Sequence, residues 1–341
     1  MRGNSTHHFT NTAILTVSTA DASEVVTSAA IDERLAETYQ RVRLRPGLLE
    51  RLVGIRERRW WPVGVTFVDG AAMAGAKAIS ESGIDPADIG IMINTSVSRQ
   101  HLEPATATAV HHALGLPSSC QNFDVTNACL GFLNGMEMAG AMIDAGLVDY
   151  ALIVNGEDSR AIQELTISNL SRTGVTARDV MSQFATLTLG SGAAAMVLGP
   201  ADRHPEGHRI VAAVSRAGTG HHRLCIGDNE GMYTDLKGLL DAGLQLSDDL
   251  WAEAAQDFDW SQGLSRYVIH QVSKIHTEAI CDRLGIDPAR VPLTFPERGN
   301  IGPASVPFTL AGELDDLLDG DRVLLMGIGS GLNACCLEIA W

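Results

Sequence analysis

The chain has 341 residues, of which 45% are hydrophobic, and its 41 acidic and 25 basic residues give a net charge of −16. This length and composition predict a globular protein with two domain-sized units and a sizeable core. The negative charge argues against a nucleic-acid partner and against binding to an anionic membrane surface.

Helix and strand patterns alternate along the first half of the chain. Apolar spacing and turn residues predict, in order, a strand at 12–19, a short helix at 31–39 that opens near Ser28 or Asp32, a helix at 69–82, a strand at 89–94, a helix that ends at Gly115, a strand at 150–155, a polar stretch at 157–181 and a glycine-rich apolar segment at 187–198. This alternation is typical of a parallel sheet and predicts an α/β fold.

A positive cluster interrupts the acidic chain, where Arg56, Arg58, Arg59, Trp60 and Trp61 lie close together. Taken alone, such a cluster is more often a solvated, partly paired surface turn. The alternative is a site for phosphate and adenine, because an arginine fork matches phosphate and an indole can stack on a base.

One cysteine, Cys129, lies between a predicted strand at 123–125 and a predicted helix that ends at Gly146. At a helix N-terminus, unpaired N–H groups and the positive end of the dipole favour a thiolate, so we expect a lowered thiol pKa that suits a nucleophile. A buried structural thiol is the ordinary alternative. Glu103, near the start of the preceding helix, is by itself most simply an acid that compensates the helix dipole.

The cysteine pattern and the N-terminus bear on the compartment. The chain has six cysteines without a CxxC pair or a regular framework, which fits a reducing environment, and we expect no disulfides. The N-terminus is polar, and no segment approaches 18 consecutive apolar residues, so we predict a cytoplasmic protein without an integral membrane segment. The cysteines are Cys120, Cys129, Cys225, Cys281, Cys335 and Cys336.

The second half of the chain repeats the rhythm of the first. A change to polar and charged residues at 200–208 predicts a boundary between halves at 1–203 and 204–341. Strands are predicted at 210–215, 265–270, 323–326 and 334–339, with residues 299–306 leading into a helix. Two similar halves predict a duplicated fold. Residues 221–262 form an acidic, mainly helical insertion without a motif that we can interpret.

Three features of the second half are candidates for chemistry. His270 ends a predicted strand, Asn300 lies between glycines ahead of a helix, and Gly329 and Ser330 lie in a glycine-rich turn after a strand. A lone histidine or asparagine in such places is more often structural. The glycine-rich turn precedes a strand, so it is not a dinucleotide fingerprint, and the chain has no Walker-type motif.

Together, these motifs resemble the thiolase superfamily, in the branch of 3-ketoacyl-acyl-carrier-protein synthase III, over nearly the whole chain. Within that branch, the Leu102-Glu103-Pro104 sequence and Ser273 are most similar to the acyl-CoA-condensing thiolases of bacterial long-chain olefin biosynthesis, the OleA group. Synthase III usually lacks that glutamate and has an asparagine two residues after its His-Gln pair. The matching stretches are Gly54–Arg58, Phe123–Val125, Ala128-Cys129, Gly190–Ala194, His270-Gln271, Gly299-Asn300, Ala304–Pro307 and the turn at Gly327.

The resemblance implies a duplicated, five-layered α-β-α-β-α thiolase fold and a non-decarboxylative Claisen condensation of two long-chain acyl-CoA molecules to a 2-alkyl-3-ketoacid or its CoA thioester. Cys129 would carry the acyl group, and His270 and Asn300 would stabilise the oxyanion. Glu103, donated across a homodimer interface into an acyl-lined pocket that raises its pKa, would remove the α-proton. The residues expected to bind the substrate are Arg56, Arg58, Trp60, Gly329 and Ser330, with no metal and no cofactor beyond the CoA of the substrate.

Other readings remain open. A decarboxylative synthase III or a ketosynthase of β-lactone metabolism would use the same fold. A non-catalytic partner subunit is least favoured, because it would be expected to lack Cys129, His270 or Asn300, and all three are present. Downstream enzymes of long-chain hydrocarbon synthesis are further candidate partners.

Overall fold

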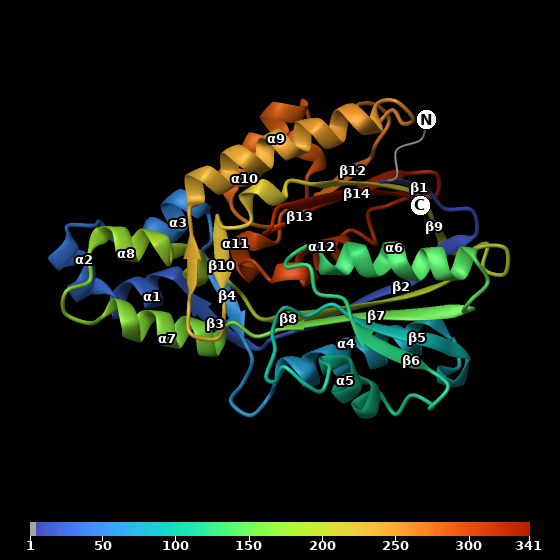
Figure 1. Ribbon diagram of the computed structural model, residues 1–341, viewed down its shortest axis with the longest axis horizontal. Coiled ribbons are helices and arrows are strands. Elements are labelled where there is room, and N and C mark those ends of the chain that lie inside the picture. The colour runs from blue at the N-terminus through green and yellow to red at the C-terminus, as the bar shows by residue number, and fades with distance from the viewer. Residues whose placement is uncertain (1–4) are drawn as a thin grey trace.

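Strands and helices form alternating layers in the computed structural model, which describes residues 5–341. Residues 1–4, the start of the polar N-terminus considered above, lie outside the described residues. Figure 1 shows two layers of strands, with helices between them and on both outer faces. The predicted α/β fold with five α-β-α-β-α layers is confirmed.

The first strand layer comes from the first half of the chain, in the order β6-β5-β7-β8-β2. Strands β5, β6 and β7 are parallel, whereas β8 is antiparallel to both β7 and β2. The strands are β2 (Thr12–Asp21), β5 (Ile89–Asn94), β6 (Gln121–Asp124), β7 (Tyr150–Glu157) and β8 (Gly192–Pro200). The outer face of this layer carries α4 (Phe67–Ser82) and α5 (Thr106–Leu114), with the 3-10 turn η1 (Pro86–Asp88) before β5.

The second strand layer runs in the order β12-β13-β14-β9, and β1 adds to β9. Strands β12 and β13 are parallel, and the other pairs are antiparallel. The strands are β1 (Thr6–His8), β9 (His208–Ala217), β12 (Arg266–Ile269), β13 (Arg322–Gly329) and β14 (Asn333–Ala340). Its outer face carries α9 (Leu236–Ala254) and α10 (Lys274–Leu284), and the short turns nearby are η3 (Thr219–His221) and η4 (Pro288–Arg290).

The two layers repeat one topology. Numbered along each half, the strand order is third, second, fourth, fifth, first in the first layer. The second layer, without β1, has four strands in the order second, third, fourth, first, which is the same order without the edge strand that corresponds to β6. The turn between β8 and β9 contains the boundary predicted at 203/204. The layers are nevertheless one continuous sheet, because Ala13 and Ile14 of β2 pair with Arg209 and His208 of β9.

The main core lies between the strand layers, around α6 (Gly131–Asp144) and α12 (Ser305–Ala311). Both helices are apolar on most sides, as expected for helices covered by a sheet on either face. The short segments η5 (Gly302–Ala304) and α11 (Phe295–Arg298) lead into α12. The buried residues of α6 include Phe132, Leu133, Met136, Ala139 and Ile143.

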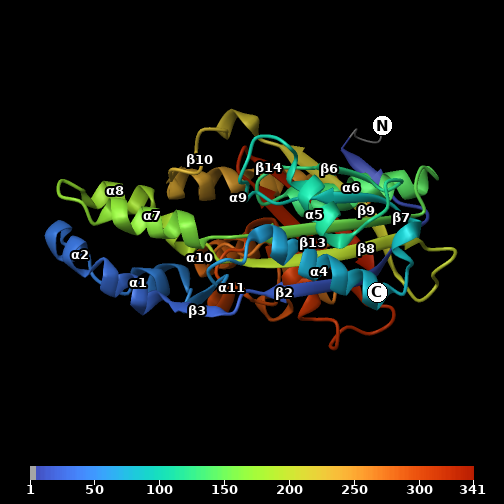
Figure 2. The ribbon, with the colours of Figure 1, turned by 90° about the horizontal axis from the view of Figure 1, so that it is seen from below.

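An arm of short helices extends from one end of the layers, as both views show (Figures 1 and 2). It has its own apolar core, which includes Ile31, Leu35, Leu170 and Phe184. A two-stranded antiparallel sheet of β3 (Glu24–Thr27) and β4 (Glu57–Trp60) lies at its base. The arm contains α1 (Ser28–Arg34), α2 (Ala36–Val42), α3 (Leu48–Val53), α7 (Arg160–Leu170), α8 (Ala177–Ser182) and η2 (Phe184–Thr188).

Several element boundaries differ from the predictions. The helix expected at 31–39 is two helices, and Thr27 caps the first by accepting a hydrogen bond from the Ala30 N–H. The first helix begins at Ser28, one of the two predicted starting points, although the Ser28 hydroxyl donates to the Ile55 carbonyl and so does not cap it. Asp32 lies inside this helix and accepts from the Gly47 N–H. The helix expected at 69–82 begins earlier, at Phe67, because Thr66 and Asp69 form a capping box.

The polar stretch at 157–181 and the insertion predicted to be mainly helical at 221–262 both contain regular elements. Residues 157–181 contain α7 and most of α8, and residues 221–262 contain α9 and a small hairpin of β10 (Cys225–Gly227) and β11 (Met232–Thr234). Among residues 5–341, no helix is long and apolar enough to cross a membrane.

Candidate active site

Cys129 lies in a tight turn between β6 and α6. Ala128, the residue before it, has a φ of 46°, a left-handed conformation that is strained for a residue with a side chain. The turn is closed by hydrogen bonds from the Leu130 N–H to the Asn127 carbonyl, at 3.0 Å, and from the Gly131 N–H to the Ala128 carbonyl, at 3.2 Å. Cys129 is therefore held by a specific turn two residues before the helix begins.

The surroundings of the Cys129 thiol overturn the expectation of a lowered pKa. Its pKa is raised to about 12, mainly by burial and to a smaller extent by the charges of the nearby Glu157 and Cys225. Desolvation thus outweighs the helix N-terminus, because a thiol that is removed from water loses the solvation that would stabilise its thiolate. The thiol is protonated at rest and must lose its proton as it attacks.

His270 follows the last residue of β12 and is buried. Its backbone N–H donates to the Met326 carbonyl of β13 at 2.8 Å, which extends the parallel pairing by one residue. Burial lowers the pKa of His270 to about 3, with a smaller contribution from His276, so the imidazole is neutral. Among the described residues, its Nδ1 has no hydrogen-bond partner. A neutral imidazole can donate one hydrogen bond to a substrate oxygen.

Asn300 is fixed by its backbone and by one side-chain contact. Its N–H donates to the Thr188 carbonyl and its carbonyl accepts from the Gly190 N–H, both at 2.9 Å. Its side-chain Oδ1 accepts from the Gly302 N–H at 2.9 Å. Because the amide oxygen is thus engaged, the Nδ2 group is the one left to donate, as an oxyanion requires.

Glycines bring the two halves together at this point. A Cβ on Gly327 would lie 2.6 Å from Leu130 Cδ1, and a Cβ on Gly329 would lie 2.8 Å from the Asn127 carbonyl oxygen. The end of β13 therefore packs directly on the Cys129 turn, and His270 lies beside that end of β13. Asn333, just past the turn that contains Ser330, donates to Asn127 Oδ1 at 3.1 Å.

Glu103 is placed differently from the other three candidate catalytic residues. Residues 101–104 are all exposed, in the stretch that precedes α5. In a single chain Glu103 therefore faces solvent, and the role predicted for it across a dimer interface stays a prediction.

The sequence analysis did not single out Glu157, the last residue of β7. It is buried beside the Cys129 turn, and burial raises its pKa to about 7. The available signal was an acid at the carboxyl end of an apolar strand, the edge of an α/β sheet where ligands bind. The β10–β11 hairpin was also missed, and it places Cys225 close enough to Cys129 to influence its pKa.

Two of the predicted substrate-binding residues are buried in the fold. Arg58 is fully buried, and its guanidinium donates to the Val26 carbonyl, Ser28 Oγ and the Leu187 carbonyl. Trp60 is also buried, and its Nε1 donates to Gln163 Oε1 at 2.6 Å. These contacts make both side chains structural, which corrects the expectation that they face a substrate.

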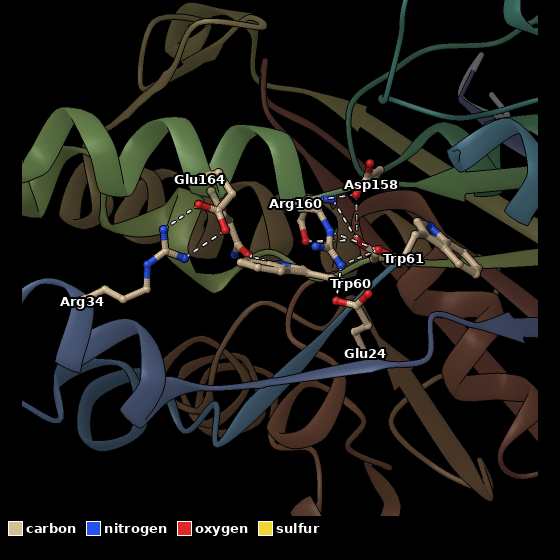
Figure 3. Close-up of polar contacts among 10 residues, drawn as sticks. Glu24, Arg34, Trp60, Trp61, Asp158, Arg160 and Glu164 are labelled. Carbon is tan, nitrogen blue, oxygen red and sulfur yellow. Dashed lines mark hydrogen bonds and ion pairs between the residues drawn. The ribbon is translucent and has the colours of Figure 1, made fainter. Parts of the chain in front are cut away.

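Arg160 is the arginine that lies against the tryptophans (Figure 3). Its guanidinium lies 5.0 Å from the centre of the Trp60 ring, donates to the Trp61 carbonyl and pairs with Glu24. By contrast, Arg56 is exposed and pairs with Glu297 at 2.8 Å. Arg56 is thus the most exposed arginine of the predicted cluster, and it can reach a phosphate in solvent by exchanging its surface pairing with Glu297.

No group of three or more His, Cys, Asp or Glu residues within residues 5–341 is arranged to hold a metal ion. All six cysteines are free thiols.

Comparisons with known proteins agree with this geometry. The family model for 3-oxoacyl-[acyl-carrier-protein (ACP)] synthase III matches residues 123–218, and the model for the C-terminal part of the same synthase matches residues 260–341. An acyl-CoA:acyl-CoA alkyltransferase of Xanthomonas campestris is 43% identical over 336 residues, which cover 98% of this chain and 99% of the relative.

Solved structures show the same likeness. A cysteine-to-serine variant of Xanthomonas campestris OleA with bound lauric acid and lauroyl-CoA matches with a TM-score of 0.95 and 42% identity, over 98% of this chain and 100% of that one. A glutamate-to-alanine variant of OleA matches with a TM-score of 0.95 and 41% identity, over 98% and 99%. The residues replaced in those two structures are as far apart in sequence as Glu103 and Cys129.

Proposed function

The chain belongs to the acyl-CoA:acyl-CoA alkyltransferase (OleA) family of synthase III-like thiolases, and on this premise we propose that it condenses two long-chain acyl-CoA molecules without decarboxylation. The observation that carries the proposal is the identity of 43% along nearly the whole of both chains. The enzyme is an acyltransferase. Coenzyme A enters as part of the substrate, and the reaction needs no other cofactor.

In the first step, the Cys129 sulfur attacks the carbonyl carbon of one acyl-CoA. A carbon–sulfur bond to Cys129 forms, the bond to CoA breaks, and the thiol proton leaves with CoA. A protonated resting thiol fits this step, because the proton is transferred only when the substrate is present. Covalent catalysis of this kind divides one difficult condensation into two easier reactions.

In the second step, Glu103 of a partner subunit removes an α-proton from the second acyl-CoA. The resulting carbanion attacks the thioester, so that a carbon–carbon bond forms and the bond to Cys129 breaks. The sulfur then regains a proton, which balances the one that Glu103 removed, and the product is a 2-alkyl-3-ketoacyl-CoA. Water can hydrolyse this thioester to the 2-alkyl-3-ketoacid with release of CoA. His270 and Asn300 donate hydrogen bonds to the oxygen on which charge develops.

The second acyl-CoA carries no carboxylate to lose, which is why a base is needed. The exposure of Glu103 supports a role between subunits, and the matched spacing of glutamate and cysteine in the OleA variants supports the assignment. Exposed Arg56 supports a grip on the CoA phosphates, together with the backbone around Gly329 and Ser330. The free cysteines and the CoA substrate support a cytoplasmic reaction, with enzymes of hydrocarbon synthesis acting on the product.

The decisive experiment supplies lauroyl-CoA alone, without a malonyl donor. We expect the wild-type protein to gain one acyl group by intact-mass analysis and to release the condensed product. Cys129→Ala should gain no acyl group. Glu103→Ala should still be acylated, while condensation falls by about 10²–10⁴-fold, as is typical for loss of a general base.

The alternatives predict other outcomes. A decarboxylative synthase would require malonyl-CoA or malonyl carrier protein, and it would keep its activity in Glu103→Ala. A glutamate that only compensates the helix dipole would cost about 0.3–1 kcal/mol of stability and leave turnover nearly normal. An acyl adduct that survives in Cys129→Ala would refute the nucleophile.

A mixing experiment tests the dimer. Neither Cys129→Ala nor Glu103→Ala should condense lauroyl-CoA by itself. A mixed dimer would combine an intact Cys129 with an intact Glu103 from the other subunit. An equal mixture should therefore recover about a quarter of wild-type activity if subunits exchange freely in a two-fold dimer. No recovery, despite mixed dimers detected by native mass analysis, would contradict the donation of Glu103 between subunits.

A further inference from the structure

Three neighbouring parallel strands of the first layer end in polar residues. Strands β7, β5 and β6 lie side by side in that order (Figure 1), and their last residues are Glu157, Asn94 and Asp124. The segment 95–105 leaves the middle strand, β5, and leads to α5. It carries Glu103, so we call it the Glu103 loop. The loop therefore starts between two carboxylates.

Glu157 holds the first part of the Glu103 loop. Its Oε1 accepts from the Val97 N–H at 2.7 Å, and its Oε2 accepts from the Ser98 N–H at 3.0 Å and from Ser98 Oγ at 2.7 Å. The Asn155 side chain also donates to Oε1, at 3.3 Å. The carboxylate is thus surrounded by donors, and the residue is only 7% exposed.

Asp124 holds the other end of the same loop. It accepts from Arg99 Nη2 at 3.1 Å, from the Thr106 N–H at 3.0 Å and from the Ala107 N–H at 2.8 Å. Between these two anchors, residues 100–104 are exposed. The structure therefore presents Glu103 on a short exposed span whose two ends are fixed by buried or part-buried carboxylates.

The anchored part of the loop also contacts the nucleophile turn. A Cβ on Gly131 would lie 3.0 Å from the Thr95 carbonyl oxygen, and a Cβ on Gly135 would lie 3.0 Å from Thr95 Cγ2. The loop is thus packed between the end of β7 and the first turns of α6. A change at Glu157 would shift the span that carries Glu103 relative to this packed framework.

We propose that Glu157 is a positioning residue for the condensation step, because its bonds to Val97 and Ser98 set the direction in which the Glu103 loop presents Glu103. This inference rests on the proposed function of Glu103 as the base that removes the α-proton. Glu157 acts through Glu103 and takes no part in the transfer of the acyl group to Cys129.

The ionisation of Glu157 provides a readout that a purely structural side chain would lack. Burial raises its pKa to about 7, against the opposing effect of the bonds from Ser98, Val97 and Asn155. Among the described residues, Cys129 is a titratable group whose pKa is affected by the charge of Glu157. The Val97–Ser98 segment and Gly302, which also lie against Glu157, carry no titratable side chain. A proton on the Glu157 carboxyl group would face the N–H and hydroxyl groups of Val97 and Ser98, which are also donors. Acidification through pH 7 should therefore weaken the attachment of the Glu103 loop to Glu157.

Glu157→Gln is the main test variant, because it keeps the shape but replaces one acceptor by a donor. We expect acylation of Cys129 by lauroyl-CoA to stay within about threefold of wild type, while condensation falls by about 10–100-fold, within the range of a misplaced catalytic group. The acid limb of the condensation rate, near pH 7 in the wild type, should move to lower pH. Ser98→Ala removes one bond and should give a smaller loss of condensation in the same direction.

Glu338→Gln is the matched control. Glu338 is also buried and accepts from Trp260 Nε1 and Arg322 Nε, but it lies in β14, away from the Glu103 loop. It controls for loss of a buried carboxylate, and both acylation and condensation should stay close to wild type. Circular dichroism and the acylation reaction check that each variant is folded.

The double variant separates this inference from its premise. If Glu157 acts through Glu103, the Glu103→Ala/Glu157→Gln enzyme should condense as slowly as Glu103→Ala and no more slowly. A double variant that is much slower would overturn the positioning role. Normal condensation by Glu157→Gln, with Glu103→Ala impaired, would overturn the inference alone. Normal condensation by Glu103→Ala would instead remove the proposed function on which it rests.

Discussion

Replacing Arg58 by alanine tests whether the arginine–tryptophan cluster binds substrate or supports the fold. The guanidinium is fully buried and donates to three acceptors, from Val26, Ser28 and Leu187. Arg58→Ala strands these acceptors, at about 1–3 kcal/mol each, and leaves a cavity where the side-chain stem was. We therefore expect a large loss of stability and little change in substrate binding.

The charge of Arg58 partly offsets that loss. Burial lowers the pKa of Arg58 from 12.5 to about 10, so keeping the guanidinium charged in the folded state costs about 3 kcal/mol. The alanine variant does not have this cost. The three stranded acceptors together cost about 3–9 kcal/mol and the cavity adds to this, so a net loss of several kcal/mol remains after the offset.

Urea unfolding and steady-state kinetics with lauroyl-CoA measure the two effects separately. Arg58→Ala should unfold at a clearly lower urea concentration, while its folded fraction keeps the wild-type KM. Arg56→Ala is the matched control, because Arg56 is exposed and pairs only at the surface. It should change stability by less than about 1 kcal/mol and raise KM more than it lowers kcat. Wild-type stability with a raised KM in Arg58→Ala would refute this reasoning.

Three further predictions concern the thiol, the packing and the pH dependence. Alkylation of Cys129 by iodoacetamide should keep rising by about tenfold per pH unit from pH 7 to 10, because burial raises the thiol pKa to about 12; a plateau below pH 9 would contradict this. Gly156→Ala should destabilise the protein by about 3 kcal/mol or more, because the new Cβ would lie 2.0 Å from the Phe67 carbonyl oxygen. The control, Gly220→Ala, has open space around the new Cβ and should leave stability in urea unfolding nearly unchanged. Burial raises the folded-state pKa of Glu157 from its usual 4.5 to about 7, so this group favours folding most below pH 4.5. About 3 kcal/mol of that stability is lost as the pH rises to 7. If stability changes with pH in this direction, the urea midpoints of wild type and Glu157→Gln should converge on the acidic side of the range.

Local patterns predicted the framework of this fold well. The strands at 12–19, 89–94 and 150–155 were predicted from apolar runs and are part of β2, β5 and β7. The turn between β6 and α6 was predicted from a short strand pattern followed by helical spacing, which placed Cys129 in it. These features depend on neighbours in the chain, and such neighbours are visible in the sequence.

The properties that failed depend on residues far away in sequence. Arg58 is buried because carbonyl groups of residues 26 and 187 converge on it, which no local pattern indicates. The Cys129 pKa is set mainly by burial, with added contributions from Glu157 and Cys225 later in the chain, so the helix-terminus argument alone gave the wrong sign. The anchoring role of Glu157 was hidden because its partners, Val97 and Ser98, follow a different strand.

The junction between the two strand layers has a consequence for synthesis of the chain. Strand β2 is among the first elements to leave the ribosome, yet its partners are β8 and β9, which begin at Gly192 and His208. Until those strands emerge, the apolar residues of β2 have no neighbouring strand, and such long-range pairing is slow and prone to aggregation. We therefore expect chaperones to bind the first half of the chain as it emerges. Nascent chains that end before residue 190 should be digested by protease at β2, and chains that extend past residue 217 should be protected there.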